Sequence, residues 1–430
     1  MILRSPLYHT PRNPFTEDRA LETFSDGALL IADGRIGAAG DYAEVRAAHP
    51  GVPVRDLRGG YLLPGFVDTH VHFPQLRGLG SLGLSLLDWL REYALPEEAR
   101  MASTEYATKS ASEFVRALAS HGTTTALSFG AHFPDATAAM FEAAAARGLR
   151  LIGGMVLSDR MLLSELHQSP ESAYRCSKQL IDRYHGRNGL AYAVTPRFAL
   201  SASEAILEVC QTLLAEHPGI TFQTHLNEND KEIHEVLRLF PWATDYLNVY
   251  EKFGLVNERG VFAHNVHASP RELECMAINK AAVAHCPCSN AALGSGIFPM
   301  RQHVNSGVKF GLGTDVGAGT GFGVLKEGLQ AYMLQRLSGA GYPLTAPHLL
   351  YLATRAGAEA LNLGDETGDF LPGKSADYVW IKPPEGSVLE TVVASAESHE
   401  RVLAAIFTLA GAESICEVGV RGRVVWELSQ

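Results

Sequence analysis

The chain has 430 residues, of which 46% are hydrophobic and 19% charged, and this composition predicts a folded protein with a large buried core. The formal net charge is −11 and no stretch of the sequence is strongly basic, so electrostatics counts against nucleic acid or an anionic membrane as a partner. We expect a small, nearly neutral molecule as the partner instead.

Neither the cysteines nor the apolar segments point to secretion or to a membrane. The six cysteines are too few and too scattered for a disulfide framework in a chain of this length, and reduced thiols are expected. The N-terminal stretch MILRSPLYHTPRNPF lacks the continuous apolar core of a signal peptide. No uninterrupted apolar run reaches the roughly 18 residues that span a bilayer. A cytoplasmic location is therefore expected.

The two ends of the chain resemble each other in their pattern. The segment GALLIADGRIGAAG near the start and the segments GDFLPGKSADYVWI and VGVRGRVVWEL near the end all read as short strands around glycine-containing turns. Two β-rich ends around a different middle predict one small β-sandwich domain assembled from residues 1–63 and 368–430.

The middle of the chain, residues 64–367, alternates strand-like and helix-like segments. Eight such units predict an α/β protein with a (β/α)8 TIM barrel, and a doubly wound open sheet is the alternative. No GxGxxG or P-loop motif marks a nucleotide site. Helix-like stretches include 108–122 and 138–148, and the expected strands are 65–72, 122–129, 150–157, 191–198, 220–227, 261–268, 281–288 and 308–316.

The first expected barrel strand carries three ionisable groups. It lies in PGFVDTHVHFPQ, and because alternate side chains of a strand share a face, Phe66, Asp68, His70 and His72 are predicted to point the same way. A core strand has no use for three ionisable groups on one face unless something there binds them. A metal ion is the obvious candidate.

Further histidines and an aspartate follow at the ends of later strands. A TIM barrel builds its active site from the carboxyl ends of its strands, so these side chains are expected to converge. Three imidazoles and a carboxylate suit Zn²⁺, which would lower the pKa of a bound water toward about 7, and iron fits nearly the same ligands. The later residues are His225, His264, His285 and Asp315.

These motifs carry a resemblance to a known family. PGFVDTHVH, the later strand-end histidines and GTD resemble the amidohydrolase superfamily, and HVHFPQ, VTPRFALS, THLNEN, AHCPCSNAALGSG and GLGTDVGAG resemble its guanine deaminase family in that order. The segments HTPRNPF and SLLDWLREYALPEE are similar to that family too. The resemblance implies zinc-dependent hydrolytic deamination of guanine to xanthine and ammonia in purine catabolism, by a cytoplasmic homodimer.

The resemblance also assigns roles to single residues. It implies that Glu228 shuttles protons, that His264 orients the water, and that Asp315 both accepts a proton and binds the metal. It further implies that Gln75, Arg197 and Phe198 contact the purine, and that the metal ligands are His70, His72, His225 and Asp315.

Two other readings of the function remain open at this stage. One is another aminohydrolase or chlorohydrolase of the same superfamily, acting on a related purine, pyrimidine or triazine. The other is a catalytically silent scaffold, which is disfavoured because every expected ligand position is filled.

Several residues near these motifs are expected to play supporting roles. Asp68 is expected to join a hydrogen-bond network rather than bind metal, and His285 and Asn290 either border the pocket or support their loop. Strand alternation would put Cys286 and Cys288 on one face. We expect them to be free thiols, because the two further ligands of a structural zinc site are missing.

Overall fold

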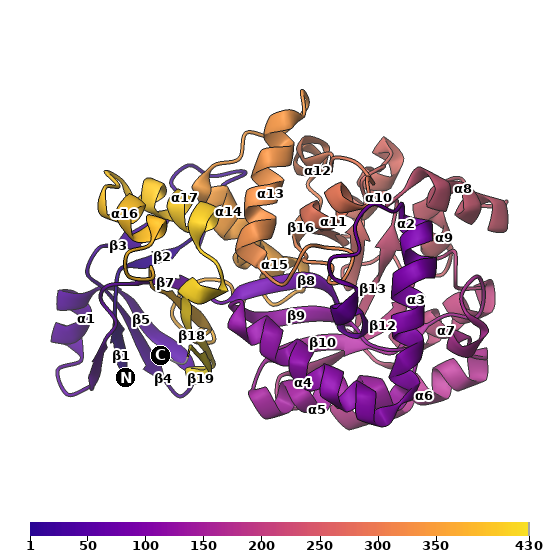
Figure 1. Ribbon diagram of the computed structural model, residues 1–430, viewed down its shortest axis with the longest axis horizontal. Coiled ribbons are helices and arrows are strands. Elements are labelled where there is room, and N and C mark those ends of the chain that lie inside the picture. The colour runs from indigo at the N-terminus through magenta and orange to yellow at the C-terminus, as the bar shows by residue number, and fades with distance from the viewer. Residues whose placement is uncertain (429–430) are drawn as a thin grey trace.

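A computed structural model describes residues 1–428 and consists of a parallel barrel beside a smaller β-rich part (Figure 1). The eight barrel strands are hydrogen-bonded in chain order and all run parallel, with β10 and the short β11 together forming the third strand, because both pair with β12. This arrangement confirms the predicted (β/α)8 fold and excludes the open doubly wound sheet. The strands are β8 (Phe66–His72), β9 (Thr123–Phe129), β10 (Arg150–Gly154), β11 (Val156–Leu157), β12 (Leu190–Pro196), β13 (Thr221–Leu226), β14 (Gly260–His264), β15 (Ala282–His285) and β16 (Lys309–Leu312).

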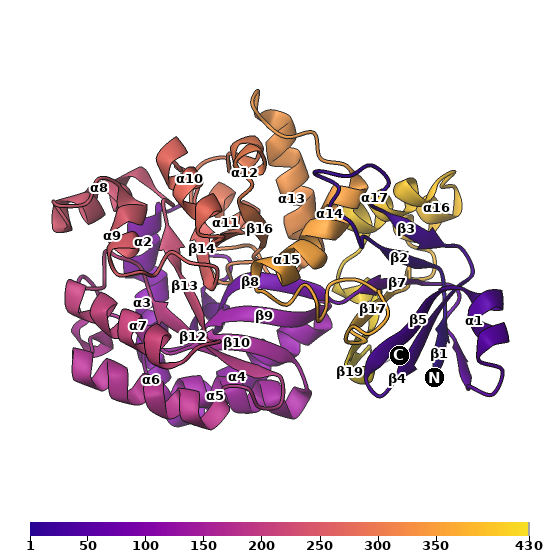
Figure 2. The same cartoon turned by 180° about the vertical axis from the view of Figure 1, so that it is seen from behind.

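Helices cover the outside of the barrel (Figures 1 and 2). Serines start several of them, because the side chain of the residue before the helix accepts a hydrogen bond from a free backbone N–H, as Ser103 does at α4. The helices of this layer are α4 (Thr104–Ser120), α5 (Pro134–Arg147), α6 (Pro170–Tyr184), α7 (Glu204–Glu216), α8 (Asp230–Leu239), α9 (Tyr246–Lys252), α10 (Pro270–Ile278), α11 (Pro287–Ala292), α12 (Met300–Ser306), α13 (Val324–Leu337) and α14 (Ala346–Ala353).

The inside of the barrel holds a small apolar core of its own. It includes Val67, Leu127 and Ile152 from successive strands, and Ala358 from α15 (Arg355–Ala360). Helix α15 packs closely because Gly357 has no side chain: a Cβ there would lie 2.9 Å from the side chain of Val67. This apolar core closes one end of the barrel. The opposite end, where the strands have their carboxyl termini, remains open for a functional site.

The structure shows that the predicted orientation of the β8 side chains was wrong for Phe66. Val67 belongs to the inner core, whereas Phe66 and Val71 belong to the outer core beneath the helices. The pairing of β8 with β9 shifts between Asp68 and Val71, where β8 uses one residue more than its partner. This irregularity reverses the alternation, so Phe66 does not share a face with the two histidines.

The structure also corrects the predicted end of the seventh strand. Strand β15 ends at His285, and Cys286 precedes helix α11, in which Cys288 lies. The two cysteines therefore do not follow strand alternation, because Pro287 occupies the first turn of a helix. Both are free thiols, as are the other four cysteines of the described chain.

The β-rich part contains two sheets built from both ends of the chain. Strands β1 (Ile2–Arg4), β4 (Gly27–Ala32), β5 (Arg35–Asp41) and β6 (Val54–Asp56) form one sheet. The other consists of β2 (Leu7–His9), β3 (Glu22–Phe24), β7 (Tyr61–Pro64), β17 (Tyr378–Ile381), β18 (Ile415–Val420) and β19 (Arg423–Glu427). Their facing apolar side chains, such as Leu29 and Leu62, share one cluster, which confirms the sandwich.

Three helices accompany these sheets. They are α1 (Tyr42–Ala48), α16 (Val388–Ala394) and α17 (His399–Leu409), and the last two lie between the two C-terminal segments that were predicted to form strands. The exact limits of the two domains, residues 1–63 with 368–430 and residues 64–367, stay a prediction.

Strand β7 of the sandwich leads almost directly into β8 of the barrel. Only Gly65 separates them, and a Cβ at this position would lie 2.2 Å from the side chain of Thr124. A larger residue would push the two parts of the chain apart. The strand that carries His70 and His72 is therefore attached firmly to the terminal sheet.

An ion pair ties the barrel to the sandwich from another side. Arg150 of β10 donates to Asp377 at 2.5 Å, and both side chains are buried. Asp377 also accepts from the Thr367 hydroxyl and from the backbone N–H of Arg421. Burial alone would raise the pKa of Asp377, but the Arg150 guanidinium outweighs burial and holds that pKa below its usual value.

The Asp377→Asn variant is expected to lower the free energy of unfolding at pH 7 by about 3 to 5 kcal/mol, since it leaves a buried arginine with poor compensation. Because the carboxyl pKa is depressed in the folded state, its stabilisation is present above about pH 4 and is lost as the pH falls through the folded value. Urea titrations across this range should show wild-type stability falling more steeply than that of the variant. Equal slopes would contradict the assignment, and Asp26→Asn in an exposed pair should change little.

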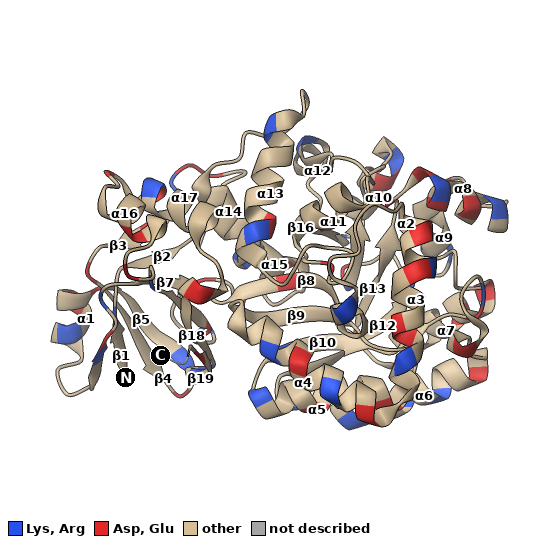
Figure 3. Cartoon of the chain, in the orientation of Figure 1, with Lys and Arg blue, Asp and Glu red and all other residues tan. Residues whose placement is uncertain are grey.

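The surface carries mixed charge. Lysine and arginine lie among aspartate and glutamate along the outer helices α4, α6 and α8, whereas α7 carries glutamate without lysine or arginine (Figure 3). In the part of the chain that the structure describes, no helix combines the length and apolarity that a bilayer crossing needs.

Candidate active site

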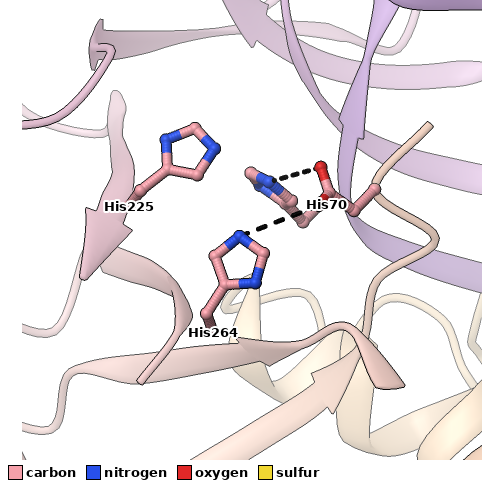
Figure 4. A group of neighbouring side chains, drawn as sticks. His70, His225 and His264 are labelled. Atoms are coloured by element: carbon pink, nitrogen blue, oxygen red, sulfur yellow. Dashed lines mark ion pairs between the residues drawn. The ribbon is translucent and has the colours of Figure 1, made fainter. Parts of the chain in front are cut away.

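Four predicted metal ligands meet at the carboxyl end of the barrel. His70 and His72 place their Nε2 atoms 3.1 Å apart, and the Nε2 of His225 lies 3.2 Å from that of His72. The Asp315 carboxylate approaches both strand-β8 histidines at 3.2 Å. Figure 4 shows His70, His225 and His264 pointing toward a common centre. The structure therefore brings together side chains that are far apart in the sequence.

The local backbone explains how these side chains approach each other. His264 and Asp315 both have left-handed backbone conformations, with φ of 72° and 48°, which are uncommon for residues other than glycine and cluster at functional sites. Asp68 accepts hydrogen bonds from the backbone N–H and hydroxyl of Thr314 at 3.0 and 2.6 Å, and thus holds the turn before Asp315. This is the supporting network that was expected of Asp68.

Burial sets the charge of the cluster. It lowers the pKa of His72 to about 4 and that of His225 well below its usual value, so these imidazoles are neutral at pH 7. Burial would raise the pKa of Asp315, but hydrogen bonds with His70 and His72 outweigh it and keep the carboxyl ionised. Neutral imidazoles around one carboxylate form a donor set that attracts a cation.

The distances also fit a metal ion. Tetrahedral ligands with bonds of about 2.0 to 2.1 Å lie about 3.3 Å from one another, close to the separations in this cluster. His225 donates from Nδ1 to the backbone oxygen of Arg197 at 2.6 Å, which leaves the Nε2 lone pair directed at the centre. The residues present therefore fit a bound divalent metal.

His264 lies one step further from the centre. Its Nε2 is 3.8 Å from Asp315 and 3.4 Å from Glu228, and its Nδ1 lies 2.9 Å from the side-chain oxygen of Asn290. Asn290 thus fixes the ring, while Nε2 has no hydrogen-bond partner among residues 1–428. Together with His70, His225 and Asp315, His264 also forms a group whose ligand atoms lie within 4.8 Å of one another.

Glu228 is buried, although its polar surroundings in the sequence are typical of an exposed helix start. Helix α8 begins after it, and its backbone N–H is held by the Glu232 side chain at 3.1 Å. Burial, reinforced by the nearby Asp315 charge, raises the pKa of Glu228 well above its usual value. This shift favours the protonated form of the carboxyl, and its Oε1 has no hydrogen-bond partner in the described chain.

A cavity opens beside this cluster. It is lined by Gln75, Arg197, Phe198 and Glu228, together with His72, His225 and Asp315. The helical segment α2 (Leu86–Trp89) covers it with Leu86 and Trp89. All three predicted purine contacts therefore lie in the same cavity as the histidine cluster.

Sequence reasoning missed one charged residue behind this cavity. Glu98 is 1% exposed and lies in α3 (Leu95–Ala99), which follows the π-helical turn Leu90–Ala94. Its Oε1 accepts hydrogen bonds from Gln75 at 2.7 Å and from Arg197 at 2.6 Å. The sequence offered two signals: Glu97 and Glu98 are adjacent, and they end the segment SLLDWLREYALPEE that is similar to the guanine deaminase family.

His285 lies outside the cavity. Its ring stacks on Phe298 with centroids 4.3 Å apart, and burial lowers its pKa to about 3. It packs within the barrel end and is not among the cavity residues.

The chain matches known proteins over most of its length. The sequence profile of the amidohydrolase family matches residues 61–425. The chain belongs to the amidohydrolase family. A shorter match over residues 27–51 is to an imidazolonepropionase-like composite domain of bacteria.

Within the amidohydrolase family, the chain is similar to guanine deaminases. It is 57% identical to a probable guanine deaminase of Deinococcus radiodurans, over 99% of this chain and 98% of that protein. The solved structure of Escherichia coli guanine deaminase matches with a TM-score of 0.96 and 39% identity, over 100% of both chains. A guanine deaminase from C. acetobutylicum with guanine bound in its active site has a TM-score of 0.91 and 26% identity, over 99% of both chains.

Proposed function

We propose that this protein is a zinc-dependent guanine deaminase, which hydrolyses guanine to xanthine and ammonia in purine catabolism. The observation that carries the proposal is the cavity in which Gln75, Arg197, Phe198 and Glu228 lie beside the histidine–aspartate cluster. The full-length similarity to guanine deaminases supports the same substrate.

The metal would be held by His70, His72, His225 and Asp315, whose donor atoms lie closest together. Zinc is proposed because three neutral imidazoles and a carboxylate are typical zinc ligands, with iron as the alternative. Bound there, the metal supplies a water that is acidic enough to act as a nucleophile at neutral pH.

The cavity residues would hold guanine by its edge and by its face. Arg197 has only N–H donors, which suit the carbonyl oxygen at C6, and Gln75 can both donate and accept on the same edge. Phe198, which is 3% exposed, offers an apolar wall for the flat ring. These contacts would orient C2 of the purine toward the histidine cluster.

Two carboxyl groups would move the protons. As water adds to C2, Asp315 takes one proton from it and Glu228 donates its own proton to N3, which removes the negative charge that develops there. Asp315 then delivers its proton to the departing amine, and the hydroxyl proton at C2 returns to Glu228. His264 would orient the water through its free Nε2. The balance is guanine and water to xanthine and ammonia.

Purified protein supplied with zinc is expected to convert guanine to xanthine with release of one ammonia per turnover. The ultraviolet change at the purine and an ammonia assay measure the two products separately. A panel that also contains other aminopurines, aminopyrimidines and a chlorotriazine should rank guanine first by kcat/KM. Absence of xanthine with metal-loaded protein would remove the proposal, and a triazine or pyrimidine ranked first would replace it by the alternative activity.

We further propose that the enzyme acts in the cytoplasm as a homodimer. All six cysteines of the described chain are free thiols, which suits a reducing compartment. The dimer rests on the family resemblance alone, and light scattering coupled to gel filtration would test it by giving the mass in solution.

A further inference from the structure

Glu98 connects the two polar side chains proposed to read the purine edge. Its Oε1 accepts from the Nε2 of Gln75 at 2.7 Å and from Arg197 at 2.6 Å, and its Oε2 lies 3.3 Å from the Nδ1 of His132. The side chains of Glu98, Arg197 and His132 are each at most 3% exposed. Glu98 itself is not a cavity residue, so it acts from behind the site.

The two contacts of Gln75 fix which way its amide points. The Nε2 donates to Glu98, while the Oε1 accepts from the backbone N–H of Gly317 at 3.2 Å. An amide turned by 180° would set its oxygen against the carboxylate and its NH₂ against an N–H group, which is unfavourable on both sides. Glu98 therefore determines where Gln75 presents its remaining donor and its remaining acceptor.

The same carboxylate fixes Arg197. A buried guanidinium needs a buried counter-charge, and Glu98 supplies it at 2.6 Å. Since Arg197 can only donate, its position in the cavity requires an acceptor on the ligand. A 6-oxopurine offers a carbonyl acceptor at C6 and an N1–H donor, whereas a 6-aminopurine offers the reverse pattern of an amino donor and an N1 acceptor.

We propose that Glu98 is a positioning residue that makes the site selective for 6-oxopurines over 6-aminopurines, by holding Gln75 and Arg197 in a single hydrogen-bonding arrangement. This inference rests on the proposed function, because it concerns how the same cavity reads its purine. It goes beyond that function because it assigns the discrimination between an oxo and an amino group at C6 to a residue that does not touch the substrate.

The neighbouring Glu97 shows what a merely structural carboxylate does in this helix. It receives hydrogen bonds from Arg100 at 3.0 Å and from the hydroxyl of Tyr106, both partly exposed and away from the cavity. Glu97→Gln is therefore a matched control: the same change of charge in the same helix, one residue away.

The test compares guanine with 2,6-diaminopurine, which keeps the 2-amino group and carries an amino group at C6. Wild type should prefer guanine, and Glu98→Gln should reduce the ratio of the two kcat/KM values by about 10- to 100-fold, the range expected for hydrogen bonds to a charged group. The loss with guanine should lie mainly in KM, because Glu98 positions binding groups. Glu97→Gln should leave the ratio unchanged. Inhibition constants for hypoxanthine and adenine, which need no turnover, should shift in the same direction.

Glu98→Asp provides a second variant that keeps the charge but withdraws it by one methylene, and it is expected to shift the ratio less. If Glu98→Gln does not yield folded protein, the same measurements are made on Glu98→Asp. An unchanged ratio of both kcat/KM and inhibition constants, in a variant with wild-type metal content and melting temperature, would overturn the inference alone. Equal shifts in Glu97→Gln would also overturn it. Failure of wild type to deaminate guanine would instead overturn the proposed function together with the inference.

Discussion

Replacing His225 by alanine is expected to abolish metal retention and guanine turnover together. His225 contributes an Nε2 atom 3.2 Å from that of His72, and its ring is held by the Arg197 carbonyl so that the lone pair faces the cluster. Loss of this donor leaves two histidines and a carboxylate, which hold a divalent ion far more weakly. Elemental analysis after dialysis against a mild chelator measures the metal, and the xanthine assay measures turnover on the same sample.

His285→Ala is the matched control for this variant. His285 is also a buried histidine at the end of a barrel strand, but it stacks on Phe298 outside the cavity. This control should keep its metal. Full metal occupancy in His225→Ala would contradict its role as a ligand, whereas metal loss in both variants would trace the effect to the barrel end as a whole.

The Glu228→Gln variant is expected to keep its metal and to lose about 10² to 10⁴-fold in kcat, the usual contribution of a positioned general acid. The amide retains the size and polarity of the protonated carboxyl but cannot pass its proton to N3 and recover it. Because Glu228 lies 3.4 Å from His264 and is not among the closest donor atoms of the cluster, metal content should stay at the wild-type level.

Glu235→Gln controls for removal of a carboxylate from the same region, because Glu235 lies on the exposed side of α8 and pairs with Arg238. It should leave kcat unchanged. Near-normal turnover in Glu228→Gln would show that the proton reaches the purine by another route. Loss of the metal in that variant would instead place Glu228 among the ligands.

The sequence allowed the barrel and the convergence of its strand-end residues to be predicted, because both follow from general rules. Parallel strands place their carboxyl ends together, so His225 and Asp315 were expected beside His70 before any distance was known. The same rules do not say which of two neighbouring imidazoles lies closer to the centre. That His72 rather than His264 completes the tightest group depends on backbone conformations, such as the left-handed His264.

Other features escaped prediction for identifiable reasons. The period-two rule contains no information on where a strand gains an extra residue, so the shift between Asp68 and Val71 could not be anticipated. Pro287, in the first turn of helix α11, indicated that a helix begins there. The apolar pattern of the segment favoured a strand instead, and the prediction followed that pattern. Helix α17 also had a signal in Ser398, which caps it.

Glu98 escaped for a different reason. It stands beside Glu97 with the same chemistry and the same local sequence, and only long-range packing distinguishes them. Its partner Arg197 is 99 residues away in the chain. No local pattern encodes that contact.

The near-continuity of β7 and β8 across Gly65 has a consequence for biosynthesis. On the ribosome, His70 and His72 are made early, but β7 pairs with β2 from the beginning of the chain and with β17, residues Tyr378–Ile381, from near its end. The strand that carries these histidines is therefore anchored on both sides only after most of the polypeptide has emerged. Barrel closure, through β16 at residues Lys309–Leu312, is likewise a late event. The metal-ligand cluster is therefore expected to assemble late in folding, after the long-range pairings of β8 and β16 have formed.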